Sequence, residues 1–157
     1  MTLAERLGEA LSQRRWTIST VESCTAGGLA YRITEVPGAS AYFLGGIIAY
    51  DNRVKVEWVG VPKRLFDEHG AVSREAAATM SENGRARFGT DLCLAITGIA
   101  GPGGGTPEKP VGTVFVSASG PAATRTERFH FDGNRERVRQ RAVNAALEMA
   151  LELLAAD

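Results

Sequence analysis

Apolar residues recur along this chain with two spacings, one typical of helices and one typical of strands. Near the start, Thr2 precedes an apolar stripe with helical spacing, made up of Leu3, Leu7, Ala10 and Leu11. Near the end, Asn134 precedes a similar stripe, made up of Val138, Ala142, Ala145, Met149 and Leu153. Hydroxyl and amide side chains favour the capping position of a helix. The pattern therefore predicts a helix ending near residues 13–15 and a long helix after Asn134.

Shorter apolar or alternating segments between these helices indicate β-strands. They cover residues 17–21, 45–50, 92–96, 113–116 and 125–131. The continuously apolar segments 45–50 and 92–96 predict buried strands, whereas 125–131 alternates and predicts a half-exposed edge strand. Helical patterns separate most of the strands, at residues 26–34, 53–58 (capped by Asn52), 62–68 and 73–88.

Strands that alternate with helices predict βαβ units and a largely parallel sheet. The last two strands turn at Ser119-Gly120-Pro121 and form a hairpin. The predicted fold class is therefore α/β, a three-layer α/β/α sandwich with a mostly parallel sheet and an antiparallel edge hairpin. A length of 157 residues suits one domain with its own core, so a single domain over residues 1–157 is expected.

The composition narrows the classes of partner. Apolar residues make up 44% and charged residues 23% of the chain, and the formal net charge is zero. Nucleic acids and anionic membrane surfaces are held by clustered excess Lys and Arg, so neither is expected as a partner. No apolar run is long enough to span a membrane, and residues 1–5 read as an amphipathic helix rather than a signal peptide. We expect a cytoplasmic protein.

Metal-binding chemistry is poorly represented. The chain has two cysteines, Cys24 and Cys93, and two histidines, His69 and His130, and none of them shows metal-ligand spacing. We expect neither a metal nor another cofactor, and a reducing environment.

Polar residues gather where three predicted strands end. These ends are Ser23-Cys24-Thr25, Tyr50-Asp51-Asn52 and Thr97-Gly98-Ile99. In parallel sheets ligands bind at the carboxyl ends of the strands, so the three ends predict a pocket. The first of them runs into a helix start, where free N–H groups bind anions and a nucleophile can be exposed.

Ser23 is the candidate nucleophile and Lys55 its candidate base. A serine at a strand end is more often a simple helix cap, and by spacing alone a solvated lysine is the commoner reading of Lys55. A lysine acts as a base only when neutral, which requires burial or a neighbouring cation. Tyr50 could orient Lys55 or relay a proton. Cys24 is an alternative nucleophile, but adjacent strand residues point to opposite sides, so only one of the two is expected to face the pocket.

Two features suit an anion. The glycine-rich stretch 98–105, which includes Gly98 and Gly101, either cradles a phosphate or carboxylate with its N–H groups or forms a flexible surface connection. Arg135 and Arg139 lie four residues apart at the start of the last helix, where guanidinium groups suit a phosphate. For Arg137 and Arg141 a solvated helix face is favoured.

Several segments together resemble one known family, the CinA C-terminal domain family, which includes nicotinamide-nucleotide amidohydrolases. They are residues 22–27, 45–52 with Lys55 and 60–61, 69–73, 97–102 and 109–114. The resemblance implies an α/β sandwich that hydrolyses the carboxamide of nicotinamide mononucleotide to nicotinate mononucleotide and ammonia, in pyridine nucleotide salvage. It also implies a serine–lysine pair, carried here by Ser23 and Lys55, with Tyr50 in the same motif.

Two departures from the family pattern stand out. Asp51 occupies a position where the family often has serine, and an anion there raises the pKa of Lys55. The longer family members also carry an N-terminal domain that these 157 residues do not include. Both favour the alternative function, a pyridine-nucleotide or phosphate-binding module without turnover. A different amidase or esterase is a third, weaker alternative.

The expected mechanism places the remaining residues. Backbone N–H groups of Thr25 and Ala26 hold the oxyanion, and Thr97, Gly98, Ile99, Gly101, Arg135 and Arg139 complete the substrate site. The partner is a small-molecule nucleotide. A homodimer is the default expectation, because two-fold dimers are the commonest oligomers, with Phe43, Trp58 and Phe66 as candidate contact residues.

Overall fold

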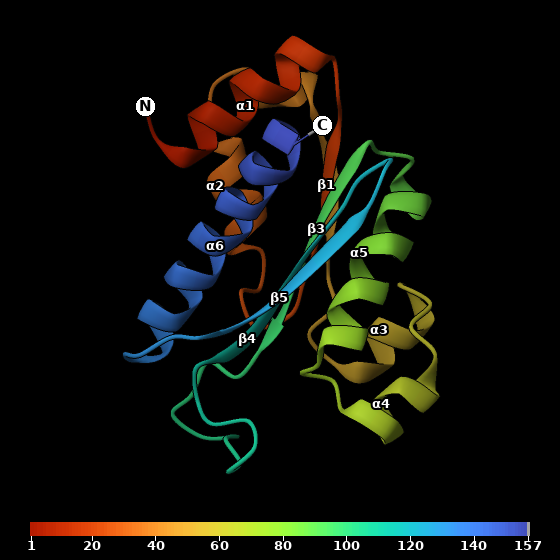
Figure 1. The fold of residues 1–157 in the computed structure, drawn as a ribbon, viewed down its shortest axis with the longest axis vertical. Coiled ribbons are helices and arrows are strands. Elements are labelled where there is room, and N and C mark those ends of the chain that lie inside the picture. Colours follow the sequence, from red (N-terminus) through yellow and green to blue (C-terminus); the bar gives the residue numbers. More distant parts are fainter. Residues whose placement is uncertain (157) are drawn as a thin grey trace.

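A five-stranded sheet with helices on both faces forms the protein, as a computed structural model of the chain shows (Figure 1). The structure describes residues 1–156. Its helices are α1 (Leu3–Arg14), α2 (Gly28–Thr34), η1 (Ala39–Ala41), α3 (Asn52–Glu57), α4 (Lys63–His69), α5 (Arg74–Phe88) and α6 (Arg135–Ala156). Its strands are β1 (Ile18–Glu22), β2 (Phe43–Ile48), β3 (Leu92–Gly98), β4 (Thr113–Ser119) and β5 (Thr124–His130).

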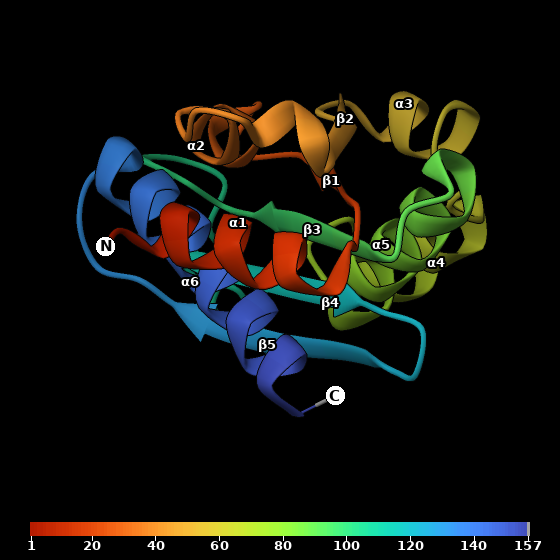
Figure 2. The ribbon, with the colours of Figure 1, turned by 90° about the horizontal axis from the view of Figure 1, so that it is seen from above.

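The sheet has the order β2-β1-β3-β4-β5. Strand β1 pairs in parallel with both β2 and β3, whereas β4 pairs antiparallel with β3 and with β5. Helices α1, α2 and α6 cover one face, and α3, α4 and α5 lie on the other (Figure 2). The predicted three-layer sandwich with an antiparallel edge hairpin is confirmed.

The apolar stripes of helices α1 and α6 are buried, as their spacing predicts. Leu7 and Leu11 of α1 and Val138 and Ala142 of α6 join one core with the sheet. A smaller core beneath α5 contains Met80, together with residues of β1 and β3. Because burying a large aliphatic side chain contributes about 1.5–3 kcal/mol, these two cores hold the layers together and fix the strand ends relative to one another.

Two local predictions were wrong. Strand β2 covers residues 43–48 rather than 45–50, and it is an edge strand in which half-buried and exposed residues alternate, not a buried strand. An apolar run cannot distinguish the two, because only strand order decides which strand has one neighbour. The cap of α3 is Asp51, whose carboxylate accepts from the Arg53 N–H at 2.8 Å, so Asn52 is the first helical residue.

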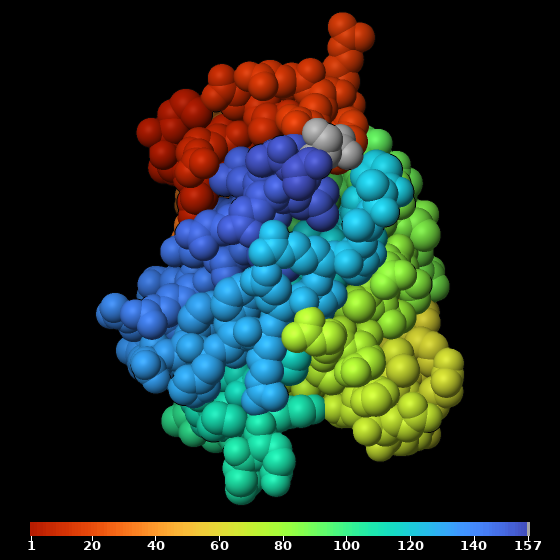
Figure 3. All heavy atoms as spheres, viewed as in Figure 1, coloured from red at the N-terminus to blue at the C-terminus, as the bar shows by residue number. Residues whose placement is uncertain are grey.

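The connection between β3 and β4 carries the glycine-rich stretch and projects from the lower end of the molecule (Figure 3). It is tied back to α4 by Lys109, whose Nζ donates to the His69 carbonyl at 2.6 Å. Within the part of the chain that the structure describes, no helix combines the length and apolarity needed to cross a bilayer.

Candidate active site

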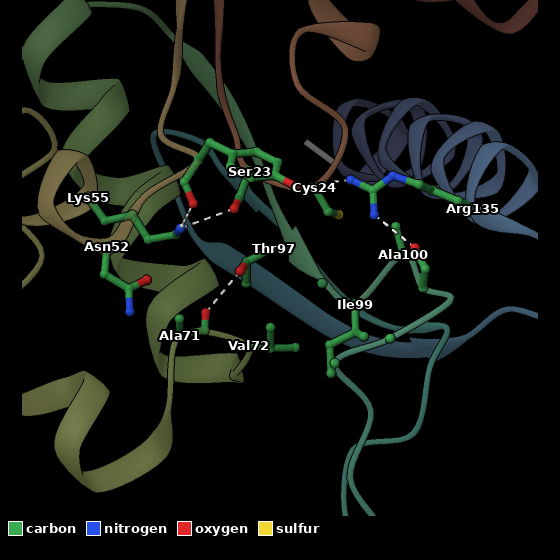
Figure 4. A pocket seen from close by; sticks show the side chains of 15 residues that line it. Ser23, Cys24, Asn52, Lys55, Ala71, Val72, Thr97, Ile99, Ala100 and Arg135 are labelled. Carbon is green, nitrogen blue, oxygen red and sulfur yellow. Dashed lines mark hydrogen bonds between the residues drawn. The ribbon is translucent and has the colours of Figure 1, made fainter.

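A cleft of about 290 Å³ lies where strands β1, β2 and β3 end. All three predicted strand ends contribute to it, through Ser23, Tyr50 and Thr97 among others. Its remaining walls come from three places, the α4–α5 connection, the glycine-rich stretch and the start of α6, with Ala71, Val72, Ile99, Gly101 and Arg135 among the lining residues (Figure 4). The cleft is therefore at the carboxyl edge of the parallel strands, where ligands of α/β sheets bind.

Ser23 and Lys55 meet at one end of this cleft. The Lys55 Nζ donates to Ser23 Oγ at 3.0 Å and to the Tyr50 carbonyl at 3.1 Å (Figure 4). Lys55 is 2% exposed and is the bulkiest of the fully buried side chains, and Ser23 is 7% exposed. The short helix α3 makes this contact possible, because it begins directly after the end of β2 and turns Lys55 back toward β1.

Burial changes the acid–base character of this lysine. Desolvation lowers the pKa of Lys55 from its ordinary value of 10.5, while the Asp51 carboxylate opposes the shift. The net direction is downward. Asp51 is exposed, and its carboxylate accepts a hydrogen bond from the Arg53 N–H as the cap of α3. Burial therefore outweighs the added negative charge, and the neutral amine is favoured compared with a lysine in water.

The turn that presents Ser23 is fastened by the residue before it. Glu22 is 1% exposed, and its carboxylate accepts from the Thr25 hydroxyl at 2.7 Å and from the N–H groups of Leu29 and Ala30 at 2.8 and 3.0 Å. The chain then passes through two left-handed residues, Ala26 with φ of 49° and Gly27 with φ of 93°. The buried carboxylate thus ties the end of β1 to the first turn of α2.

This arrangement corrects the expectation of an anion site at that helix start. The N–H groups of Leu29 and Ala30 bind Glu22, and that of Ala26 donates to the Ser23 carbonyl at 3.0 Å. Ala26 is therefore not free to hold an oxyanion. In the same turn, the N–H groups of Cys24 and Thr25 have no partner within residues 1–156. Ser23 itself donates its N–H to the Ile96 carbonyl.

Of the two predicted roles of Tyr50, orienting Lys55 or relaying a proton, the structure supports only the first. Its backbone carbonyl accepts from Lys55, but its side chain is 56% exposed and its hydroxyl accepts from Arg135 at 3.0 Å. The structure does not bring the phenol to the amine. Tyr50 orients Lys55 through the main chain, and a proton relay through the phenol has no geometric basis here.

The other predicted residues separate into two groups. Thr97, Gly98, Ile99, Gly101 and Arg135 line the cleft. The Thr97 hydroxyl donates to the Ala71 carbonyl at 2.9 Å, which ties β3 to the wall before α5. Thr25 and Arg139 instead line a neighbouring groove of about 470 Å³ between α2 and α6, which Arg135 also borders. Ala26 lines neither hollow.

Cys24 lies closer to the chemistry than expected. It lines the cleft beside Ser23, although it also packs into the core beneath α2 and α6. Burial raises the pKa of the Cys24 thiol to about 11, so this cysteine is held in its unreactive protonated form. Of the two adjacent residues, only Ser23 contacts the amine.

Sequence reasoning missed the role of Glu22, and it placed Asn52 at a strand end of the pocket without giving it a role in the site. Glu22 falls inside a strand, where a carboxylate gives no signal of the three donors that it binds. Asn52 lines the cleft, but its position after a strand suggested a helix cap, and Asp51 has that role. Among the described residues, no group of three or more His, Cys, Asp or Glu side chains could hold a metal ion.

Comparison with known proteins places the chain in a family. The sequence model of the family described as the CinA C-terminal domain matches residues 1–154. The chain belongs to the CinA C-terminal domain family. A nicotinamide-nucleotide amidohydrolase, PncC, from Pseudomonas putida is 46% identical over 152 residues, which cover 97% of this chain and 95% of that protein.

Longer relatives share only this part. A CinA-like protein from Desulfotalea psychrophila is 43% identical over 99% of this chain, but the match spans 38% of its length. Among solved structures, a CinA superfamily protein from Klebsiella pneumoniae has a TM-score of 0.95 at 32% identity, covering 99% of this chain and 97% of that one. A competence/damage-inducible protein from Agrobacterium tumefaciens gives 0.93 at 36% identity, with 98% and 93% covered.

Proposed function

We propose that this CinA-family chain is an amidohydrolase that converts nicotinamide mononucleotide to nicotinate mononucleotide and ammonia. One observation carries the proposal. A buried lysine with a lowered pKa contacts a serine hydroxyl at 3.0 Å in a cleft at the carboxyl edge of the sheet. The relative from Pseudomonas putida, which this chain matches over nearly its whole length, supports the choice of substrate.

In the proposed reaction, neutral Lys55 accepts the proton of Ser23 as Oγ attacks the carboxamide carbon. The C–N bond then breaks, the protonated Lys55 gives its proton to the departing nitrogen, and ammonia leaves an ester on Ser23. Lys55 next accepts a proton from a water molecule as that water attacks the ester carbon. The carboxylic acid leaves, and the proton held by Lys55 returns to Ser23 Oγ. No step requires a metal or a cofactor.

The oxyanion of each tetrahedral intermediate needs donors beside Ser23. We assign this role to the N–H groups of Cys24 and Thr25, which have no partner within the described residues. In α/β-hydrolases the N–H group of the residue after the nucleophilic serine supplies one such donor. Each donor of this kind contributes about 10²–10³ in rate. Thr25 keeps its predicted role, and Cys24 takes the place of Ala26.

The test is ammonia release from nicotinamide mononucleotide by the pure protein. Wild type should release ammonia and form nicotinate mononucleotide, and the Ser23→Ala protein should release none while keeping the same thermal unfolding midpoint. Ser81→Ala is a matched control, since that buried serine bonds to Ser117 beneath α5, away from the cleft. Equal rates for wild type and Ser23→Ala would exclude the serine mechanism.

A binding module without turnover is the alternative, and Asp51 is the observation that favours it, because its charge raises the pKa of Lys55. Binding of the nucleotide without any ammonia release would support this alternative. Burial acts in the opposite direction and is the larger influence on this pKa, so the enzyme is the favoured reading.

The wider setting forms part of the same proposal. The reaction would return nicotinamide nucleotide to pyridine nucleotide salvage in the cytoplasm, where the buried thiols of Cys24 and Cys93 stay reduced.

A homodimer remains a prediction. Of its three candidate contact residues, Trp58 is 63% exposed, whereas Phe43 and Phe66 are half-buried. The edge strand β2 adds the exposed residues Leu44 and Ile48.

A further inference from the structure

A second hollow adjoins the active cleft and is larger than it. This groove of about 470 Å³ runs between α2 and α6, and its walls include Thr25, Tyr31, Arg32, Arg135 and Arg139. Arg135 borders both hollows, and Thr25 of the groove lies two residues after Ser23 of the cleft. The segment 23–25 is therefore the partition between them.

The three arginines of the groove donate hydrogen bonds only to uncharged groups of the protein. Arg32 donates to the Asn144 side-chain oxygen at 3.1 Å, Arg135 to the Gly101 carbonyl at 2.8 Å, and Arg139 to the Thr25 carbonyl at 3.4 Å. These acceptors are neutral, and none of the three arginines forms an ion pair within residues 1–156. By contrast, Arg125 on strand β5 pairs with Glu127 and with Glu152.

Two carboxylates also border the groove. Glu136 accepts from the Gln140 side chain at 3.3 Å, and Glu35 lies at the exposed end of α2. Three guanidinium groups against two carboxylates leave a net charge of plus one. Guanidinium groups that face one space, with their donors only partly used, match the oxygens of a phosphate.

The size of the cleft also indicates that a nucleotide would extend into the groove. Small-molecule sites usually measure about 300–1,000 Å³, so the cleft alone is at the lower limit for a nucleotide. A ligand whose reacting group lies beside Ser23 has to extend past Arg135. Together with the groove, the space is ample for a ribose phosphate.

We infer that the α2–α6 groove is the phosphate subsite of the enzyme, in which Arg139 and Arg32 bind the phosphate and Arg135 guides the ribose between the two hollows. The inference rests on the proposed function, because it places the carboxamide at Ser23. It also adds Arg32 to the site, assigns the phosphate to the groove rather than to the glycine-rich stretch, and makes phosphate recognition the source of selectivity for a nucleotide over its nucleoside.

The test measures binding, so that it does not depend on turnover. In a Ser23→Ala background, titration calorimetry gives the dissociation constants of nicotinamide mononucleotide and of nicotinamide riboside, which differ only by the phosphate. Arg139→Ala and Arg32→Ala should each weaken binding of the mononucleotide by roughly 10- to 100-fold, the usual loss for a charged hydrogen bond. Both should leave riboside binding unchanged.

Arg137→Ala is the matched control, because Arg137 is exposed on the same helix and lines neither hollow. It should leave both affinities unchanged. Inorganic phosphate should compete with the mononucleotide and not with the riboside. The inference is overturned if the Arg139 and Arg32 variants bind the mononucleotide as before, or if they lose affinity for both ligands in parallel.

The two proposals fail separately. A wild-type protein that binds the mononucleotide through the groove but releases no ammonia would end the amidase proposal and retain the phosphate subsite. A protein that releases ammonia equally well from both compounds, with equal affinities, would retain the amidase and end the subsite.

Discussion

The two sides of the Ser23–Thr25 segment hold positive charge in opposite ways. On the cleft side, Lys55 is 2% exposed and is surrounded by protein, so its pKa is lowered and its amine can exist uncharged. On the groove side, Arg135 is exposed and Arg32 and Arg139 are half-buried, and their guanidinium groups keep their charge because guanidinium does not lose its proton in proteins. The comparison teaches that burial can turn a lysine into a base, whereas arginine remains a cation and is suited to binding.

Replacing Lys55 should have the largest effect, and this effect should be confined to the cleft, where the reaction takes place. Lys55→Met keeps the length of the side chain but removes the base, so kcat should fall by at least about 10³-fold. The free energy of unfolding should stay the same or rise by about 1 kcal/mol, since no amine has to be desolvated. Ammonia assays and urea unfolding measure the two quantities. A less stable variant would contradict this account of the lysine.

The same variant tests the direction of the pKa shift. Because the folded state lowers the pKa of Lys55, the unfolded chain binds more protons between that lowered value and 10.5. Wild-type stability should therefore rise with pH across this window and be insensitive to this group below it. In Lys55→Met this contribution is absent. Urea unfolding at a series of pH values distinguishes the two proteins, and identical curves would show that the lysine is not perturbed.

Removing the negative charge of Glu22 should have an intermediate effect on kcat and should leave substrate binding in the groove unchanged. In Glu22→Gln the amide nitrogen faces a backbone N–H, so one buried donor loses its partner, which costs about 1–3 kcal/mol. The turn that presents Ser23 should loosen. We expect a lower kcat with little change in KM for the mononucleotide, since the arginines are untouched.

Exposed Glu9 on α1 supplies the control, because Glu9→Gln should change neither stability nor kcat. Steady-state kinetics and thermal unfolding provide the readouts. If Glu22→Gln raised KM and left kcat unchanged, Glu22 would act on binding rather than on the position of the nucleophile.

Neutralising Asp51 should have the smallest effect and sharpen the comparison. Asp51→Asn removes the charge that opposes the lowered pKa of Lys55, while asparagine still caps α3. The acidic limb of the kcat/KM–pH profile should move to lower pH, and the maximal rate should stay the same. Asp67→Asn, at an exposed position on α4, should leave the limb in place. A shift toward higher pH would contradict the electrostatic role of Asp51.

Much of the fold was predictable because it depends on local spacing. The stripe of α6, the caps Thr2 and Ser73 and the apolar run of β3 each carry a signal within a few residues. The position of β2 at the sheet edge carried no such signal, since a run with two glycines and four apolar residues fits a central strand equally well.

The site was predictable in part, for the same reason. Strand ends can be read from sequence, so Ser23, Thr97 and the start of α3 were assigned to one pocket before the structure was known. The direction of the Tyr50 side chain, the partners of Glu22 and the use of the Ala26 N–H depend on neighbours distant in sequence or on the conformation of the turn. Those predictions were absent or wrong.

The amino-acid sequence alone predicted the α/β class from helix periods and strand ends, and its motifs identified the family. The pairing of Ser23 with Lys55 came from the resemblance to that family, because the spacing of Lys55 by itself favoured a solvated lysine. Only the tertiary structure decided that Lys55 is buried, that Glu22 closes the start of α2, and that three arginines from two helices share one groove. Burial and side-chain direction arise from packing between segments far apart in the chain, and packing has no local period to read.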